Sequence, residues 1–352
     1  MSQIPVPSRA ATELPAINRS HLEAMSDGTG IWQFASGVAP HRVHGYCTDD
    51  VARALIVDVL HGQSLGWESV AGAVERDVTF LAEAFDVRTG RFRNFRSATR
   101  QWLPGTGSED CHARALLGLG TLLAWHPEPR TNDEVGTLFF NALPAADDFC
   151  ELRPIASTIL GAAAAIEGGF DAAATTFEAL GKRLVHAFAG VDDAWPWPIE
   201  TVTYENALLP RALIHFGERS GEPKVSALGL RVLDWLVAAQ TSGDGHFSPV
   251  GNRGWWVRGR EKAAWDQQPI EATSTVLAAL EAYRASGADR YRQIAERAFG
   301  WFLGENDLEL AVADLDRGGC RDGLCPDGPN ANEGAESTLM WLTALEAMRR
   351  LR

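Results

Sequence analysis

The sequence is short of positive charge. Lysine and arginine number 32 against 46 aspartates and glutamates, which gives a formal net charge of −14 over 352 residues. A surface that acidic repels nucleic-acid phosphates and anionic lipid headgroups. No apolar run reaches the roughly 20 residues that a bilayer-spanning helix needs. We therefore expect neither a nucleic-acid partner nor a membrane span.

Cysteines and targeting signals are scarce as well. Five cysteines, an odd number, do not form a disulfide framework, and reduced thiols are the simplest interpretation. The N-terminus lacks the basic start and the apolar core of a signal peptide. Both absences favour a cytoplasmic protein. Residues 1–16 are predicted to be a flexible extension, and because no linker rich in proline, serine or charge follows, we expect a single catalytic domain over residues 1–352.

Strand signals are few, and helical signals dominate. Only residues 90–95 and 245–250 show short strand-like stretches. Elsewhere apolar residues recur at i, i+3 and i+4, which is typical of helices. The predicted helices cover residues 17–27, 48–62, 68–86, 108–124, 132–145, 153–167, 171–188, 203–217, 223–240, 268–284, 289–303 and 334–350.

The predicted helices alternate in character. One set is apolar along its whole length, as in residues 153–167, whereas the intervening set is amphipathic, as in residues 223–240. A helix that is apolar all round is buried, and an amphipathic helix lies against solvent. Strict alternation of about six of each predicts six helical hairpins closed into an all-α (α/α)6 toroid, with short β-hairpins in the loops at most. An irregular helical bundle is the alternative.

Polar groups gather where the apolar helices begin. Five of the six open with acids or amides, and the third opens with Arg153 instead. The five openings are Thr48–Asp50, Ser108–Asp110, Tyr204–Asn206, Asp266–Glu271 and Asn332–Ser337. Acids in a first turn also serve as caps and favour the helix dipole. Glu271 and Glu336, however, lie in otherwise apolar helices, where a buried carboxylate is costly unless it is paired or solvated. Because inner helices of a toroid run parallel, we expect these acids around one wet central pocket.

Several carboxyl groups in one pocket suit glycosidic chemistry. One protonated carboxyl donates to the leaving oxygen, and a second acts as base or nucleophile. Burial and like-charge crowding raise the pKa of one of them toward neutrality. The candidate catalytic acids, in order of preference, are Asp110, Glu271, Glu336, Asp50, Glu205 and Asp266.

Aromatic and polar residues of the connections supply candidate substrate contacts. An indole in a loop presents a flat face to a sugar ring, and arginine binds oxygen atoms bidentately. Each of them also has a plain structural alternative, either packing between hairpins or a salt bridge. The candidates are Arg53, His112, Arg114, Trp195, Trp197, Tyr204, His246, Trp255, Trp256, Arg258, Gln267, Gln268 and Asn332.

Metal binding is the other class of site that we considered. Cys47, Cys111 and His112 are potential zinc ligands, but no CxxC or HExxH spacing occurs. A buried free cysteine is commonly a small apolar filler. No GxGxxG, P-loop or GxSxG motif occurs either. We expect no metal and no cofactor, and zinc is the weaker alternative.

The motifs together resemble a known family. They are residues 47–55, 91–95, 107–110, 245–252, 266–272 and 334–338. They are similar to the six-hairpin, glycosidase-like module often appended to, or encoded beside, bacterial retaining glycosyltransferases. The similarity runs from about residue 40 to 350. It implies an (α/α)6 fold, a carbohydrate substrate and a separate glycosyltransferase as partner, but no single reaction. Such modules usually carry Asn after the Asp pair, where this chain has Val51.

From these observations we expect a glycoside hydrolase that acts on an oligosaccharide or glycoconjugate. Two alternatives stay open. One is a non-catalytic sugar-binding module that supports a glycosyltransferase. The other is a sugar lyase or epimerase on the same toroid. The resemblance of architecture implies paired histidines for an epimerase, for which His112 and His246 are the candidates, whereas a lyase acting on uronates requires a basic cleft.

Overall fold

The computed structural model describes residues 13–351. Most of the predicted flexible extension, residues 1–12, lies outside this range. The described α-helices are α1 (Ser20–Ala24), α2 (Thr48–Leu65), α3 (Ala71–Ala84), α4 (Glu109–Trp125), α5 (Pro129–Ala142), α6 (Leu152–Glu167), α7 (Ala174–Ala187), α8 (Leu208–Arg219), α9 (Pro223–Ala239), α10 (Pro269–Ser286), α11 (Asp289–Gly300) and α12 (Ala335–Leu351). All twelve overlap the predicted helices, with α8 beginning five residues later than expected.

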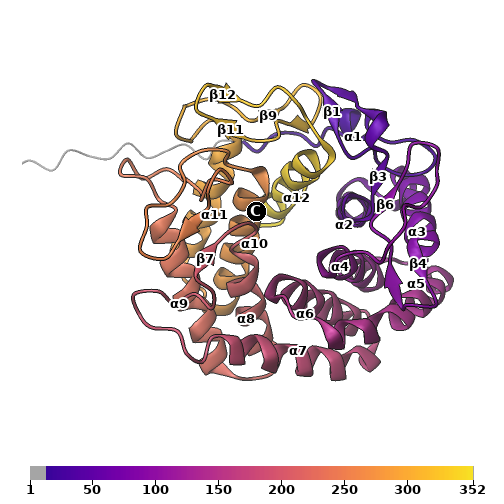
Figure 1. Cartoon of the computed structure of the whole chain (residues 1–352), viewed down its shortest axis with the longest axis horizontal. Helices are drawn as coiled ribbons and strands as arrows, with labels where there is room; N and C mark the ends of the chain where they lie inside the picture. The colour runs from indigo at the N-terminus through magenta and orange to yellow at the C-terminus, as the bar shows by residue number, and fades with distance from the viewer. Residues whose placement is uncertain (1–12, 352) are drawn as a thin grey trace, which may run out of the picture.

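The helices form a double ring (Figure 1). The even-numbered helices α2 to α12 make the inner ring, in which each packs against the next and α12 packs against α2 to close it. The longer odd-numbered helices α3 to α11 lie outside, and the short α1 completes the outer set near α12. The prediction of an (α/α)6 toroid is therefore confirmed.

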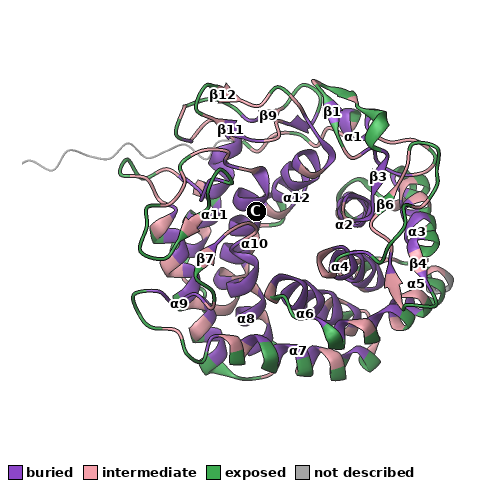
Figure 2. Cartoon of the chain, in the orientation of Figure 1, coloured by how far each residue is buried: buried purple, intermediate pink, exposed green. Residues whose placement is uncertain are grey.

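Burial follows the two rings (Figure 2). The inner helix α6 is buried along nearly its whole length, whereas the outer helix α11 buries one face through Tyr291 and Phe299. Small residues let the inner helices approach closely. A Cβ atom on Gly120 in α4 would collide with the Gly161 carbonyl of α6. The apolar, alanine-rich sequences thus encode close inner-ring packing.

The β-structure consists of two-residue strands in the loops. Each pair is antiparallel: β1 (Ala35–Ser36) with β2 (Ala39–Pro40), β3 (Tyr46–Cys47) with β6 (Phe95–Arg96), β4 (Phe85–Asp86) with β5 (Arg91–Phe92), β7 (Thr201–Val202) with β8 (Trp256–Val257), β9 (Ala313–Asp314) with β10 (Gly319–Cys320), and β11 (Leu324–Cys325) with β12 (Gly328–Pro329). The predicted strand at 90–95 is confirmed in part, because the range holds β5 and the start of β6, two separate strands with different partners. The one at 245–250 is wrong, because only an isolated bridge joins Thr241 to Phe247 there.

The short pairings hold together the loops that precede the inner helices. Strand β3, just before α2, pairs with β6 in the loop before α4. Gln267, just before α10, bridges Leu324 in the loop before α12. The N-terminal ends of the inner helices therefore share one end of the toroid, which we call the mouth. Short 3-10 helices occupy other connections: η1 (Arg42–His44), η2 (Trp67–Ser69), η3 (Leu143–Asp148), η4 (Asp171–Ala173) and η5 (Trp301–Leu303). Over residues 13–351, the helices fall short of the length and apolarity that crossing a membrane requires.

Candidate active site

A cavity of about 410 Å³ opens at the mouth, between the first turns of α2 and α12. Its volume lies within the range of small-molecule sites. We call it the mouth cavity. It is lined by Gln33, Phe34, Cys47, Asp49, Asp50, Arg53, Phe95, Arg114, Gln268, Asp322, Gly334, Ala335, Glu336 and Ser337.

Arg53 holds two of the cavity acids. Its Nη1 donates to Asp50 Oδ1 at 3.0 Å, one helical turn back in α2, and its Nη2 lies 2.7 Å from Glu336 Oε2 in α12. Asp50 and Arg53 are buried, whereas the Glu336 side chain is 42% exposed. The site thus places one buried and one open carboxyl group on the same guanidinium.

Burial raises the pKa of Asp50 to about 7. The charge of Arg53 opposes this rise, and the carboxylates of Glu336 and Asp49 add to it. The Arg53 guanidinium itself stays charged, since Glu336 and Asp50 outweigh the effect of burial and raise its pKa. A carboxyl group with a pKa near 7 can exchange a proton at neutral pH.

Arg114 makes a second bridge between acidic side chains at the mouth cavity. Its Nε lies 3.2 Å from Asp49 Oδ1, and its Nη1 donates to Glu205 Oε2 at 2.8 Å. All three side chains are at least 85% buried. The predicted acid Glu205 is therefore held beside the cavity through Arg114, with its backbone in the left-handed region at φ 46°.

Glu271 does not line the mouth cavity. Its carboxylate accepts hydrogen bonds from the backbone N–H of Glu205 and from the N–H and side-chain amide of Asn206. Burial raises its pKa to about 7 against these donors and the charge of Arg153. Arg153 donates to the Tyr204 carbonyl and to Asn206 Oδ1. The two buried groups fix the loop that carries Glu205.

The remaining predicted acids lie outside the cavity lining. Asp110 accepts a hydrogen bond from the Tyr204 hydroxyl. Its neighbour Glu109 accepts from the backbone N–H groups of Cys150 and Glu151 at the start of α6, and so acts as a cap. Asp266 has φ 62° and accepts from Asn252 Nδ2 at 3.2 Å.

The predicted indoles mostly pack with one another. Trp195, Trp197 and Trp256 form one cluster with Trp235 of α9, with ring centroids 4.7–6.1 Å apart in the contacting pairs. Trp255 is 39% exposed, but its Nε1 donates to Asn252 Oδ1 outside the cavity lining. These contacts match the structural alternative of packing between hairpins.

The predicted polar contacts divide in the same way. Gln268 lines the cavity, while Gln267 is fully buried and accepts from Trp301 Nε1 at 2.9 Å. Asn332 accepts from the Gly37 N–H, and Arg258 pairs with Asp192 on the exposed loop.

Neither predicted histidine lines the cavity. His112 is fully buried, with Nε2 3.0 Å from the Ala142 carbonyl and Nδ1 accepting from the Phe92 N–H. Burial lowers its pKa to about 4. His246 is held between Ser242 and Asp307.

The residues proposed as zinc ligands do not form a metal site. Burial raises the pKa of the thiols of Cys47 and Cys111, which disfavours the thiolate that zinc requires. Throughout residues 13–351 there is no group of three or more His, Cys, Asp or Glu side chains that could hold a metal ion. The zinc alternative has no support from this arrangement.

Several cavity residues were not among the predicted site residues, and four of them bear on its chemistry. Asp49 was noted only as part of a helix opening. Asp322 comes from the loop of residues 318–332, rich in Gly and Asp, and it accepts from the Gly334 N–H at 2.7 Å. Phe34 and Phe95 are 43% and 37% exposed and lie in the lining. Phe95 is the last residue of the predicted strand at 90–95, but nothing in the sequence marks Phe34.

No family model and no curated protein matches this sequence. Solved structures do match its fold. Cellobiose 2-epimerase from Bacillus thermoamylovorans B4167 aligns with a TM-score of 0.74 at 11% identity, over 95% of this chain and 96% of that one. A D-mannose isomerase gives 0.72 at 10% identity over 94% of both chains. The GH76A α-1,6-mannanase from Salegentibacter sp. HEL1_6 gives 0.62 at 12% identity, over 95% and 97%.

These neighbours are enzymes that act on sugars, and they include both isomerising enzymes and glycosidases. At 10–12% identity the likeness establishes the (α/α)6 toroid and not the reaction. The reaction has to follow from the residues that line the mouth cavity.

Proposed function

We propose that this protein is a glycoside hydrolase whose reaction takes place in the mouth cavity, with Asp50 and Glu336 as the catalytic pair. The observation that carries the proposal is the shared guanidinium of Arg53, which holds a buried carboxyl and a solvent-open carboxyl in one cavity. Different surroundings for two neighbouring carboxyl groups are how glycosidases separate acid from base.

In this mechanism Asp50 is the proton donor. Its pKa of about 7 keeps much of it protonated at neutral pH, so it can give a proton to the leaving glycosidic oxygen. The carboxylate that results stays on Arg53. Glu336, more open to solvent, acts as the leaving oxygen departs. If it attacks the anomeric carbon, Asp50 recovers its proton from the water that hydrolyses the glycosyl-enzyme; if it instead takes a proton from the attacking water, the two carboxyl groups return to their starting states by proton exchange with solvent.

The rest of the lining favours an uncharged sugar. The half-exposed rings of Phe34 and Phe95 offer apolar faces to a pyranose ring. Gln268 supplies a donor and an acceptor for hydroxyl groups. Asp49 and Asp322 add negative charge that opposes a uronate or phosphate substrate. We therefore propose a neutral oligosaccharide or glycoconjugate as substrate.

Histidine-based epimerisation is less well supported. Of the described residues that line the mouth cavity, none is a histidine. Both ring nitrogens of His112 bind backbone groups, and those of His246 bind side chains elsewhere. A purely sugar-binding module, for its part, has no need of two carboxyl groups in contrasting environments.

We also propose a separate glycosyltransferase as partner, and this part of the proposal rests on the family resemblance alone. Its test is a pull-down with the tagged chain from the source cells. We expect a retaining glycosyltransferase to be enriched relative to a control variant whose surface charges are reversed. If none is recovered, this part of the proposal is wrong, and the hydrolase assignment is unaffected.

The hydrolase assignment is tested with a panel of oligosaccharides and aryl glycosides. We expect Asp50→Asn and Glu336→Gln to lower turnover by about 10²–10⁴-fold while sugar binding persists. Asp289→Asn and Glu296→Gln, the same changes on the exposed outer helix α11, are the controls. Release of no sugar from the whole panel would favour the binding module. Release that survives both cavity substitutions would assign the chemistry to other acids.

A further inference from the structure

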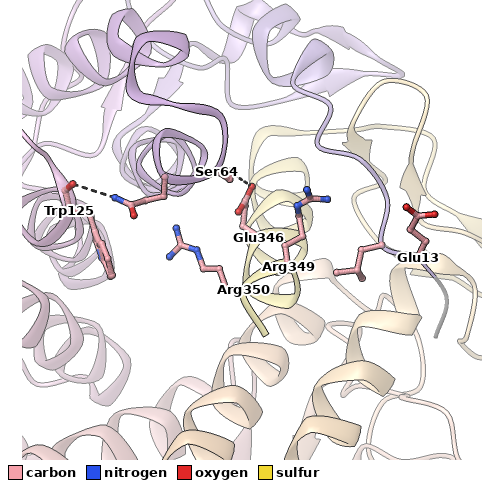
Figure 3. Close-up of a pocket in the computed structure, with 8 residues that line it drawn as sticks. Glu13, Ser64, Trp125, Glu346, Arg349 and Arg350 are labelled. Carbon is pink, nitrogen blue, oxygen red and sulfur yellow. Dashed lines mark hydrogen bonds between the residues drawn. The ribbon is translucent and has the colours of Figure 1, made fainter. Parts of the chain in front are cut away.

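A second and larger cavity, of about 660 Å³, lies at the end of the toroid away from the mouth. It is framed by the last turns of α2, α4 and α12 and by the chain before α1 (Figure 3). We call it the base cavity. It is lined by Glu13, Leu14, Gln63, Ser64, Trp125, Glu346, Arg349 and Arg350, none of which lines the mouth cavity.

A buried carboxylate forms part of its wall. Glu346 is only 1% exposed, and its Oε1 accepts from the Ser64 hydroxyl at 2.8 Å. Within residues 13–351 its Oε2 has no hydrogen-bond partner. The nearest ring nitrogen, His61 Nε2, is 3.8 Å from Oε1 and equally unpartnered in that range. The two groups make this wall of the cavity polar as well as buried.

An exposed indole and two guanidinium groups stand beside this carboxylate. Trp125 is 45% exposed at the end of α4, and the Arg350 guanidinium lies 5.7 Å from its ring centroid. Arg349 donates to the Pro15 carbonyl at 3.2 Å and is exposed at the cavity edge. Figure 3 shows the side chains of Arg349 and Arg350 on opposite sides of Glu346, with Arg350 on the side of Trp125.

We propose that the base cavity binds an anionic sugar, one pyranose ring that carries a phosphate or a carboxylate. The ring contacts the Trp125 indole, and its hydroxyl groups bond to the Gln63 amide in the cavity wall. The anionic group is bound by Arg350 beside the indole, because a guanidinium group binds phosphate and carboxylate oxygens bidentately. The site shares no residue with the proposed catalytic pair, so the two proposals stand or fall separately.

Isothermal titration calorimetry on the full chain tests this site. The probes are the 6-phosphates of glucose, mannose and galactose, the corresponding hexuronates, and the neutral hexoses. We expect one phosphate or uronate to bind at least about tenfold more tightly than its neutral hexose, and the phosphate and uronate arms identify the anion. Trp125→Ala and Arg350→Ala should each weaken that binding about tenfold or more, while Trp125→Phe keeps most of it.

The control is Arg292→Ala, which removes an exposed arginine of α11 and should leave binding unchanged. Asp50→Asn and Glu336→Gln should also leave it unchanged, because they alter only the mouth cavity. Three results would overturn the proposal: no anionic hexose binds, binding survives both Trp125→Ala and Arg350→Ala, or binding is lost in the mouth-cavity variants. The calorimetry measures binding alone, so loss of hydrolase activity would not by itself count against the base cavity.

Discussion

Arg53 of α2 contacts Glu336 of α12 across the seam where the inner ring closes, with Nη2 2.7 Å from Oε2. These helices are the first and the last of the inner ring, nearly 300 residues apart in sequence. The contact that joins them also sets the two carboxyl groups of the proposed catalytic pair side by side. The same guanidinium therefore belongs both to the contact that joins α2 to α12 and to the proposed catalytic site.

Replacement of Arg53 by methionine should destabilise the fold. Removal of the buried guanidinium leaves the buried Asp50 without its hydrogen-bond donor, at a cost of about 1–3 kcal/mol in the free energy of unfolding. The measurement is urea unfolding followed by circular dichroism at pH 7. Arg292→Met, which breaks ion pairs on the exposed face of α11, is the control and should cost less than about 1 kcal/mol. Equal losses for the two variants would show that the Arg53 bridge has no special weight.

The activity should fall as the pH rises through about 7, because Asp50 must carry a proton and burial puts its pKa there. The profile is best measured as kcat/KM on an oligosaccharide, whose leaving group needs protonation. Arg53 lowers the pKa of Asp50, so the alkaline limb of any residual activity in Arg53→Met should shift to higher pH. A limb that stays in place would assign it to another group.

The free energy of unfolding should also depend on the protonation of Asp50, and the direction of this pH dependence follows from its raised pKa. The pKa of Asp50 is about 7 in the folded state against the ordinary 3.8, so the folded state binds the proton more tightly. The resulting stabilisation is complete below about pH 4 and is lost as the pH rises through 7, a change of about 4 kcal/mol. Unfolding in urea at several pH values should therefore show a flatter profile for Asp50→Asn than for the wild type. Parallel profiles would contradict the raised pKa.

The helices could be predicted because periodicity records burial. The contrast between the apolar residues 153–167 and the amphipathic residues 223–240 separates inner from outer helices without any long-range information. The two-residue strands could not be predicted equally well. Four of the six pairs in the described chain are hairpins of only two residues per strand, and the other two, β3 with β6 and β7 with β8, join loops about 50 or more residues apart.

The sequence predicts that the site lies at the mouth, but it does not predict which side chains line the cavity. The position of an acid at the start of an inner helix follows from sequence, but the direction of its side chain does not. Asp50 lines the cavity and is bound by Arg53. Glu271 instead accepts hydrogen bonds from the amides of residues 205 and 206, which lie in another loop. Trp195 and Trp256 likewise pack together from loops about 60 residues apart. Such long-range partners leave no local signal in the sequence.

The loop before α8 should depend on Glu271. Glu271→Ala leaves the two backbone N–H groups and the Asn206 amide without their acceptor, at a cost of about 3 kcal/mol in the free energy of unfolding. It also frees Glu205 from its place beside Arg114, so activity should fall together with stability. Glu271→Gln keeps one acceptor oxygen and should fall between the wild type and the alanine variant in urea unfolding. An alanine variant as stable as the wild type would show that this carboxylate has no positioning role.

Two glycine substitutions should change stability in opposite directions. Gly120 lies where α4 meets α6, and an added methyl group would collide with the Gly161 carbonyl, which belongs to a backbone that cannot move without opening the inner ring. We expect Gly120→Ala to cost about 2–3 kcal/mol in the free energy of unfolding. Gly72 lies in the exposed first turn of α3 with nothing within 4 Å of the added Cβ position. Gly72→Ala should therefore gain up to about 1 kcal/mol, because alanine loses less backbone entropy in a helix. Thermal and urea unfolding of the two variants measure both signs, and a tolerated Gly120→Ala would mean that α4 and α6 do not approach as closely as the toroid requires.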